Sequence, residues 1–277
     1  MEKIIHYCWF GPKPLGKLEK KCIASWKKYL PEYKIMKWSE ENVNLNECEF
    51  IKEAYAQKKW AFVADYVRTK VLYEYGGIYM DTDMEVISDL NEFEDKDLVF
   101  GLEDSGEPNA AIVIVNKKHN KYIKKLYDKY NNSKFNETGD LFDIAIPKQI
   151  EWLLNPIGLK LGSNKIQKLN DNVFVYPREY FYPLSYDMKN NIFTSNTKTI
   201  HHFSASWFSY FEKRDIWIKR HKLSKIRNII ILPSVCFCFL ALGLSKTKIL
   251  KLSDEKKKNY RDNIWSNTLL HRNGDKS

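Results

Sequence analysis

The sequence contains few of the residues that break or loosen a folded chain. Only 11 glycines and 9 prolines occur among its 277 residues, and there is no internal repeat and no low-complexity linker. Hydrophobic residues make up 44 % of the chain and charged residues 29 %. This composition does not fit a disordered, collagen-like or polytopic membrane protein. The length is that of one large domain or two small ones with a sizeable core, so a peptide-sized binding module is not expected.

Cysteine is also scarce, and its spacing argues against two common roles. The five cysteines are odd in number, include no Cys-x-x-Cys pair and lack the spacing of zinc sites. We expect reduced, buried thiols of a cytoplasmic protein at Cys8, Cys22, Cys48, Cys236 and Cys238. The first residues, Met1 to His6, hold no charged leader followed by an apolar run, so we expect no cleaved secretion signal.

Most of the chain carries no excess of positive charge, because the excess is confined to the C-terminal residues. The formal net charge is +10. Residues 212–277 hold 16 Lys and Arg against 6 Asp and Glu, which is the whole excess, whereas residues 1–211 are neutral overall. We therefore predict a neutral folded domain, 1–211, followed by a basic tail, 212–277.

Strand and helix patterns alternate through the neutral part. The apolar run 3–9 predicts a first buried strand, 18–29 a helix and 33–38 a second strand. A long helical pattern, 50–75, ends at two glycines that can adopt the left-handed conformation. Further strands are predicted at 78–80, 97–102, 110–116, 173–176 and 199–203, and further helices near 119–130 and 147–154. This alternation predicts an α/β fold with a mostly parallel sheet flanked by helices.

The acidic motif Asp81-Thr82-Asp83 follows directly after the apolar strand 78–80. Regular strand geometry does not bring two such carboxylates round one ion, so they converge only where the strand gives way to a loop. Ligands of α/β proteins bind at such strand ends. Oxygen ligands suit Mg²⁺ or Mn²⁺, whose other positions are filled by substrate phosphates and water. A solvated acidic loop is the alternative, and the neighbouring motifs favour the metal.

Asp65 and Arg68 lie three residues apart in the predicted helix 50–75, and therefore on one side of it. A carboxylate beside a guanidinium can accept hydrogen bonds from sugar hydroxyls and donate to them at a fixed spacing. The two residues are therefore a candidate sugar-binding pair. An ordinary intrahelical salt bridge is the alternative interpretation.

Three motifs together make the sequence resemble a known family. They are Ile4-Ile5-His6-x-x-Trp9-Phe10-Gly11, then Ala64-Asp65-x-x-Arg68 with Leu72-Tyr73-Glu74-x-Gly76-Gly77-Ile78-Tyr79-x-Asp81-x-Asp83, and His201-His202-x-x-x-Ser206-Trp207. Over about residues 1–210 the chain is similar to the glycosyltransferase family with a sugar-binding region containing a DXD motif, family 32 of the retaining GT-A enzymes. That family includes capsular polysaccharide glycosyltransferases, fungal mannosyltransferases of outer-chain initiation and, distantly, the clostridial glucosylating toxins.

The resemblance implies a GT-A-like, Rossmann-type fold and a role for each matching residue. Asp81 and Asp83 are the implied catalytic pair, with Asp83 a direct metal ligand and Asp81 a contact to the metal or to the ribose of the nucleotide. Asp65 and Arg68 are implied to hold the donor sugar. Trp9 is implied to lie near the nucleotide base, and a core aromatic is the equally open alternative for this residue.

The same resemblance places two late residues at the site. In the family the histidine of the His-x-x-x-x-Ser-Trp pattern is a metal ligand, which corresponds to His201, and Trp207 is implied to contact the nucleotide. His202 is the close alternative to His201. Because neighbouring residues on a strand point to opposite faces, only one of the two histidines is expected to reach the ion. Thr138-Gly139-Asp140 departs from the family, since many relatives have Thr-Gly-Pro.

The activity implied is metal-dependent transfer of a sugar from a nucleotide-sugar donor to a hydroxyl group of a glycan acceptor, with retention of the anomeric configuration. Mn²⁺ or Mg²⁺ is the implied cofactor, and the metal would stabilise the charge on the leaving diphosphate. UDP is the favoured nucleotide. A lipid-linked oligosaccharide in capsular or surface polysaccharide synthesis is the favoured acceptor.

Two other functions stay open for the same motif. An Asp-x-Asp after an apolar strand also opens the haloacid-dehalogenase phosphatases, in which one aspartate is a phosphoryl nucleophile, but that motif continues with Thr or Val where Glu85 stands. A non-catalytic sugar-binding protein is the other alternative. Nucleic acid is not expected as a partner, because the basic residues surround an apolar run and do not interleave with aromatics.

The basic tail contains an 18-residue uncharged stretch, Asn228 to Ser245, with basic clusters on both sides. A helix over Ile229–Leu244 would span roughly 24 Å, less than the ~30 Å hydrocarbon core, and Pro233 would interrupt it. We expect a monotopic or re-entrant segment that its basic flanks draw to anionic lipid, so the protein is predicted to be cytoplasmic and peripheral to the inner face of the cell membrane. A C-terminal helix buried against the body is the alternative.

Overall fold

The computed structural model describes residues 2–135 and 141–204. The predicted basic tail with its membrane segment, Trp207 and the family departure at Thr138-Gly139-Asp140 lie outside these ranges. The division of the chain at residue 211 therefore stays a prediction. Within the described ranges, no helix is both long and apolar enough to span a bilayer.

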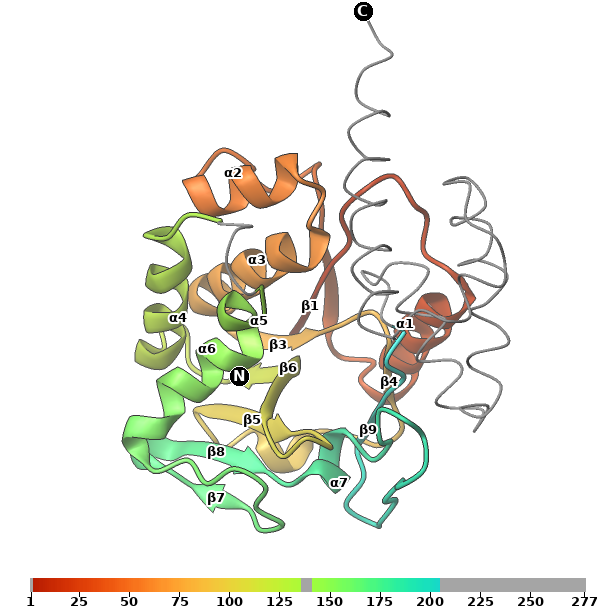
Figure 1. Ribbon diagram of the computed structural model, residues 1–277. Helices are drawn as coiled ribbons and strands as arrows, with labels where there is room; N and C mark the ends of the chain where they lie inside the picture. The colour runs from red at the N-terminus through yellow and green to blue at the C-terminus, as the bar shows by residue number, and fades with distance from the viewer. Residues whose placement is uncertain (1, 136–140, 205–277) are drawn as a thin grey trace, which may run out of the picture. The chain divides into compact units, whose positions relative to one another are not determined.

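A seven-stranded sheet forms the centre of the fold (Figure 1). From one edge to the other its strands are β2 (Lys34–Trp38), β1 (Ile4–Cys8), β3 (Gly77–Met80), β6 (Pro108–Val115), β5 (Leu98–Leu102), β8 (Val173–Tyr176) and β7 (Gln167–Lys168). Strands β2, β1, β3, β5 and β8 run in one direction, and β6 and β7 run in the other. The sheet is therefore mostly parallel, as predicted, and the carboxyl ends of β1, β3 and β5 lie at one edge.

Helices cover both faces of this sheet. They are α1 (Lys17–Tyr29), α2 (Glu49–Ala56), α3 (Trp60–Tyr75), α4 (Lys121–Asn131), α5 (Leu141–Ile144), α6 (Ile146–Leu154) and α7 (Arg178–Phe181), with short 3₁₀ turns at Asn91–Phe93, Asn155–Ile157 and Asn170–Asn172. Figure 1 shows α2, α3, α4, α5 and α6 together on one side, and α1 on the other side beside β4 (Met84–Val86). This mixed α/β arrangement is consistent with the GT-A-like fold that the resemblance implies.

Alternation of side chains along the strands divides the core into two layers. Tyr79 and Val113 pack in the layer formed with α2, α3, α4 and α6. Their neighbours Ile78 and Ile112 pack on the opposite face, in the layer that contains Trp26 of α1. A sheet that is covered on both faces buries successive residues alternately in the two layers, which is why its strands read as continuous apolar runs.

A second, two-stranded sheet joins residues that are far apart in the sequence. β4 pairs antiparallel with β9 (Thr199–His201), so that Met84 lies opposite His201. The strand predicted at 199–203 is therefore too long by two residues. Phe203 adopts a left-handed backbone conformation with φ 48°, which a strand cannot continue through.

The single helix predicted over 50–75 is wrong, because the structure has α2 and α3 in its place. Lys58, in the break, adopts the left-handed conformation with φ 57°. The Lys59 amide donates to the Ala54 carbonyl at 2.9 Å, a bond that closes the end of α2 as in a Schellman motif. Apolar residues continue on both sides of the break, so the periodicity alone does not reveal it.

Three of the five cysteines lie in the described ranges. Cys8 and Cys22 are buried, Cys48 is half-buried, and none of the three forms a disulfide bond. Cys236 and Cys238 lie outside the described residues.

Two glycines let the chain pass directly from α3 into β3. Gly76 and Gly77 have φ values of 67° and 88°. A Cβ atom at Gly77 would lie 2.5 Å from the Ile4 carbonyl oxygen, so only glycine fits where β3 joins β1. The Gly76 carbonyl oxygen lies 2.9 Å from Nε2 of His6, and Nδ1 of His6 accepts from the Trp38 indole at 3.1 Å. Both ring nitrogens of this buried histidine are therefore used in its neutral form.

We expect His6 to make the stability of the protein depend on pH. Burial lowers the pKa of His6 from 6.5 to about 4, so between these values the unfolded chain binds a proton that the folded protein excludes. The stability that the neutral ring contributes is present above pH 6.5 and is lost as the pH falls towards 4. Between pH 7.5 and 5, the unfolding free energy in urea should fall by about 2 kcal/mol more for the wild type than for His6→Asn. Parallel pH profiles for the two proteins would contradict this expectation.

Candidate functional site

The residues predicted to bind metal and sugar lie at the carboxyl edge of the sheet. Asp81 directly follows β3, and Trp9 directly follows β1, the strand next to β3 in the sheet. Arg68 reaches the same edge from α3, where its Nη2 donates to Oδ1 of Asp81 at 3.0 Å and its Nη1 donates to the carbonyl of Ala110 in β6. Neighbouring strands and one helix thus position the site.

A tight turn after β3 places the two aspartates near each other. The Asp81 amide donates to the Ala111 carbonyl at 2.8 Å, which extends the β3–β6 pairing by one residue. The Met84 amide donates to the Asp81 carbonyl at 3.0 Å and closes a turn over 81–84. The chain therefore changes direction between β3 and β4, which is what lets the carboxylates of Asp81 and Asp83 converge.

The pairing of β4 with β9 adds His201 to these carboxylates. One side-chain ligand atom each of Asp81, Asp83 and His201 lie within 4.8 Å of one another. Nε2 of His201 is 3.4 Å from Oδ1 of Asp83, and both residues are buried. Two carboxylate oxygens and one imidazole nitrogen are donors that a divalent metal ion can use. The three residues form a candidate metal site.

Close contacts balance the charge of this cluster. Burial acts to raise the pKa of Asp83, but His201 and the Ser204 amide, which donates to Oδ2 of Asp83 at 2.7 Å, hold it well below its usual range. Burial acts to lower the pKa of His201, but the carboxylates of Asp83, Asp81 and Glu103 together raise it. Nδ1 of His201 is buried and has no hydrogen-bond partner within the described ranges. The close approach of this imidazole and two carboxylates fits a bound cation.

His202 points away from this cluster. Its Nε2 lies 2.8 Å from Oε2 of Glu85, which also accepts from Lys21 of α1 at 2.8 Å. The His202 amide donates to the Asp83 carbonyl at 3.1 Å. The structure therefore brings His201, and not His202, to the aspartates, as alternation along a strand requires.

Asp65 and Arg68 are buried and adjoin the candidate metal site. Nη2 of Arg68 lies 3.5 Å from Oδ1 of Asp65, and the guanidinium lies over the Tyr79 ring, 4.2 Å from its centroid. Oδ2 of Asp65 accepts from the Ile146 amide at 3.2 Å. The two residues form an intrahelical ion pair, which was the alternative interpretation of the sequence. Since Arg68 also contacts Asp81, the ion pair lies beside the site, and its sugar-binding role stays a prediction.

Burial and Arg68 act in opposite directions on the pKa of two carboxyl groups. Burial raises the pKa of Asp65 to about 7, although Arg68 acts to lower it. Burial also raises the pKa of Asp81, again against the effect of Arg68. Without the guanidinium, both carboxyl groups would ionise less readily at neutral pH.

Trp9 lines a pocket at the carboxyl ends of β1 and β2. The pocket has a volume of about 450 Å³, and its lining includes Trp9, Gly11, Lys13, Lys20, Lys37 and Ser39. Nε1 of Trp9 donates to the Lys13 carbonyl at 2.6 Å, and the half-buried ring packs partly against the core layer of α1. Stacking of a nucleotide base on this ring stays a prediction. Trp207, the other residue predicted to contact the nucleotide, lies outside the described residues.

Three further polar residues at the same edge were not predicted from the sequence. Nδ2 of Asn109 donates to Oε2 of Glu103 at 2.6 Å, and the Tyr182 hydroxyl donates to the Asn109 carbonyl at 3.3 Å. The Tyr182 ring packs against the His201 imidazole, with 5.8 Å between the ring centroids. Glu103 directly follows the apolar strand predicted at 97–102, so the rule that singled out Asp81 could have found it. Tyr182 carries no comparable signal.

Two solved structures show distant similarity to this chain. The PaToxG glycosyltransferase is 18 % identical over 56 % of this chain and 69 % of its own, with a TM-score of 0.47. A transferase that carries two Cys-to-Ser substitutions is 13 % identical over 58 % of this chain and 88 % of its own, with a TM-score of 0.37. Similarity at this level supports no functional argument. No curated protein matches the chain.

A family model matches part of the chain more directly. Residues 16–100 match the glycosyltransferase sugar-binding region containing a DXD motif. The matched stretch contains α3 with Asp65 and Arg68, and the turn with Asp81 and Asp83. The match, with the geometry above, supports a glycosyltransferase-type domain that has a DXD sugar-binding region and a candidate Asp-Asp-His metal site.

Proposed function

We propose that the protein is a metal-dependent glycosyltransferase that moves a sugar from a nucleotide-sugar donor to a hydroxyl group of a glycan acceptor. The observation that carries this proposal is the convergence of Asp81, Asp83 and His201 at the carboxyl edge of the sheet. The two aspartates belong to the region that matches the DXD family model. This edge of an α/β sheet is where ligands bind.

The proposed donor lies along this edge in the order of the strands. Its nucleotide base occupies the pocket lined by Trp9, at β1 and β2, where an aromatic ring offers a stacking surface. Its diphosphate lies at the metal site after β3, and its sugar reaches Asp65 and Arg68. The Arg68 guanidinium supplies hydrogen-bond donors, and Asp65 supplies acceptors, to the sugar hydroxyls. A metal ion bound by Asp81, Asp83 and His201 would stabilise the charge that develops on the leaving diphosphate.

Mn²⁺ is the proposed ion, with Mg²⁺ second. Magnesium prefers an octahedral set of oxygen ligands, including several waters. The candidate site includes an imidazole nitrogen, from His201, beside its two carboxylates. Transition metals accept imidazole more readily than magnesium does, and manganese also suits carboxylates.

The finer features of the proposal rest on the sequence motifs. They are a UDP donor, a hexosyl group transferred with retention, membership of family 32, and a lipid-linked glycan acceptor in capsular or surface polysaccharide synthesis. A position at the cytoplasmic face of the cell membrane rests on the charge and apolar content of residues 212–277. A lipid-linked acceptor at that surface would agree with such a tail.

Release of nucleoside diphosphate from a panel of nucleotide sugars tests the proposal. The full chain is incubated with each donor in Mn²⁺, in Mg²⁺ and in EDTA, without an acceptor. We expect slow hydrolysis of one donor that requires the metal, and that donor names the sugar and the base. Release of phosphate from simple phosphate esters, with no donor hydrolysed, would favour a phosphatase. Sugar binding with no turnover in Mn²⁺ would favour a non-catalytic binding protein.

A further inference from the structure

We propose that Glu103 is the carboxylate that binds a hydroxyl group of the acceptor sugar and so helps to select the acceptor. This inference rests on the proposed function, because it requires a sugar donor at the site described above. Glu103 lies outside the three sequence motifs and outside the matched region, 16–100. Its place in the sheet, its contacts and the turn that carries it point to this role.

The strand order places Glu103 on the side of the metal site away from the nucleotide pocket. β6 lies between β3 and β5, so β5 is two strand spacings, ~10 Å across the sheet, from β3. The carboxyl end of β5 lies opposite Pro108, three residues along β6 from Ala111, which accepts from the Asp81 amide. The pocket with Trp9 lies in the other direction, at β1 and β2. A donor that extends from that pocket past the metal site directs its sugar towards β5. The acceptor must then approach from the side where Glu103 stands.

A continuous set of contacts joins Glu103 to the metal site. Glu103 accepts from Asn109, the Asn109 carbonyl accepts from Tyr182, and the Tyr182 ring packs against His201. The carbonyl of Ala110, next to Asn109 in β6, accepts from Arg68. Glu103 is therefore linked through β6 and Tyr182 to His201 of the candidate metal site, and through β6 to Arg68 of the predicted sugar-binding pair.

Glu103 also retains the capacity to accept further hydrogen bonds. Its Oε2 accepts from Asn109 at 2.6 Å, and its Oε1 accepts from the Ser105 hydroxyl at 3.2 Å. Whereas Glu107 pairs with Lys148 at 2.7 Å, Glu103 forms no ion pair with a lysine or arginine of the described ranges. An ionised carboxylate has about four lone-pair sites, so acceptor positions stay available for a ligand hydroxyl.

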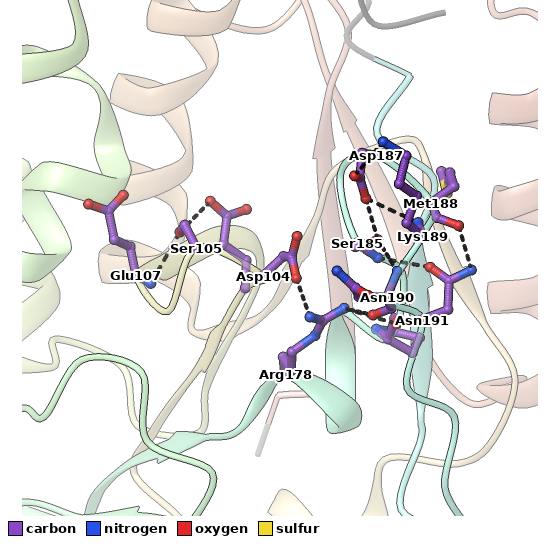
Figure 2. A network of polar contacts seen from close by, with 12 residues as sticks. Asp104, Ser105, Glu107, Arg178, Ser185, Asp187, Met188, Lys189, Asn190 and Asn191 are labelled. Atoms are coloured by element: carbon purple, nitrogen blue, oxygen red, sulfur yellow. Dashed lines mark hydrogen bonds and ion pairs between the residues drawn. The ribbon is translucent and has the colours of Figure 1, made fainter. Parts of the chain in front are cut away.

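Arg178 holds the turn that carries Glu103 from one side (Figure 2). Its Nη1 contacts the carboxylate of Asp104, next to Glu103. Its Nη2 donates to the carbonyls of Asn190 at 2.8 Å and Pro183 at 3.3 Å. One guanidinium thus ties the turn between β5 and β6 to the segment 183–191.

The same turn is held from the other side by α6. Lys148 contacts Glu107 at 2.7 Å, and inside the turn the Glu103 amide donates to the Glu107 carbonyl at 2.9 Å. The Gly106 amide donates to the Glu103 carbonyl at 2.9 Å. Selective binding of one hydroxyl requires a side chain held in place by its surroundings, and this turn meets that requirement.

Nucleoside diphosphate release with and without an acceptor tests the proposal. The full chain is assayed with the donor and metal ion that the release assay identifies, and a panel of p-nitrophenyl glycosides serves as acceptors. We expect at least one glycoside to accelerate release by the wild type. In Glu103→Gln, the ratio of release with that glycoside to release without it should fall at least ~10-fold, with a raised KM for the glycoside, because a hydrogen bond to a charged group is lost. Glu103→Asp, which keeps the charge, should retain a higher ratio than Glu103→Gln.

Glu49→Gln is the control, since it makes the same change at an exposed residue of α2, outside the turn, where the carboxylate lies 3.7 Å from Lys52. The ratio should stay at its wild-type value in this variant, because an exposed ion pair contributes little to the fold. The acceptor role is overturned if Glu49→Gln lowers the ratio as much as Glu103→Gln does, or if Glu103→Gln slows release equally with and without glycoside. It is also overturned if no glycoside accelerates the wild type. Failure of the proposed function looks different: the wild type then releases no nucleoside diphosphate from any donor.

Discussion

Replacing Asp83 by asparagine should abolish the metal-dependent release of nucleoside diphosphate, with a loss of at least ~10³-fold in kcat. Asparagine keeps the size of the side chain and an oxygen that can accept from the Ser204 amide. It removes the charge that pairs with His201 and that a divalent ion requires. Turnover of the identified donor in Mn²⁺ measures the loss, and electron paramagnetic resonance of Mn²⁺ measures binding of the ion directly.

Asp89→Asn is the control for this experiment. Asp89 is exposed, and its Oδ1 accepts from the Asn91 amide at 3.1 Å, so the same chemical change is made outside the site. Turnover and Mn²⁺ binding should both stay at their wild-type values in this variant. If Asp83→Asn bound Mn²⁺ as the wild type does, the ion would have to be held by other residues.

At pH 9, where the Asp65 carboxyl group of the wild type is mostly ionised, replacing Arg68 by methionine should reduce the free energy of unfolding by about 3–5 kcal/mol, because a buried carboxyl group loses the cation that favours its ionised form. Arg68 contacts Asp65 at 3.5 Å and Asp81 at 3.0 Å. In the variant, the Ile146 amide stays as a hydrogen-bond donor to Asp65 from the described ranges. Methionine fills much of the same volume without charge, so the lost ion pairs dominate the result. Urea unfolding measures the loss.

The pH dependence of this loss separates charge from packing. The pKa of Asp65 is about 7 with Arg68 present, and without the guanidinium it should rise further. Because the pKa of Asp65 is higher in the folded protein than in the unfolded chain, the free energy of unfolding falls as the pH rises from the unfolded-state pKa to the folded-state pKa. In Arg68→Met the folded-state pKa is higher still, so the free energy of unfolding goes on falling above pH 7. The deficit of Arg68→Met relative to the wild type should therefore be larger at pH 9 than at pH 6.

A double variant provides the matched control. Asp65→Asn removes the carboxyl group that needs a cation, so Asp65→Asn/Arg68→Met should be more stable than Arg68→Met at pH 9. If the deficit of Arg68→Met were equal at the two pH values and unchanged in the double variant, lost packing would explain it.

Local sequence was sufficient for most elements of the fold. Apolar runs bounded by turn residues located β1, β3, β5, β6 and β8 to within a few residues. It was not sufficient for the break between α2 and α3, because Lys58 adopts a left-handed conformation that its residue type does not favour. It also did not show that β6 runs against its neighbours, because strand direction depends on pairing with residues elsewhere in the chain.

The candidate site divides in the same way. The sequence by itself determined that Asp81 and Asp83 would converge after a strand and that Asp65 and Arg68 would share one side of a helix, since both pairs depend on spacing within one element. Only the tertiary structure decided that His201 and not His202 joins the aspartates, through the pairing of β4 with β9. Sheet order likewise brought Glu103 to the same edge. His201 and Glu103 are separated from the aspartates by roughly 20 to 120 positions in the sequence. Pairing over such separations depends on burial and strand register, which local sequence patterns do not encode.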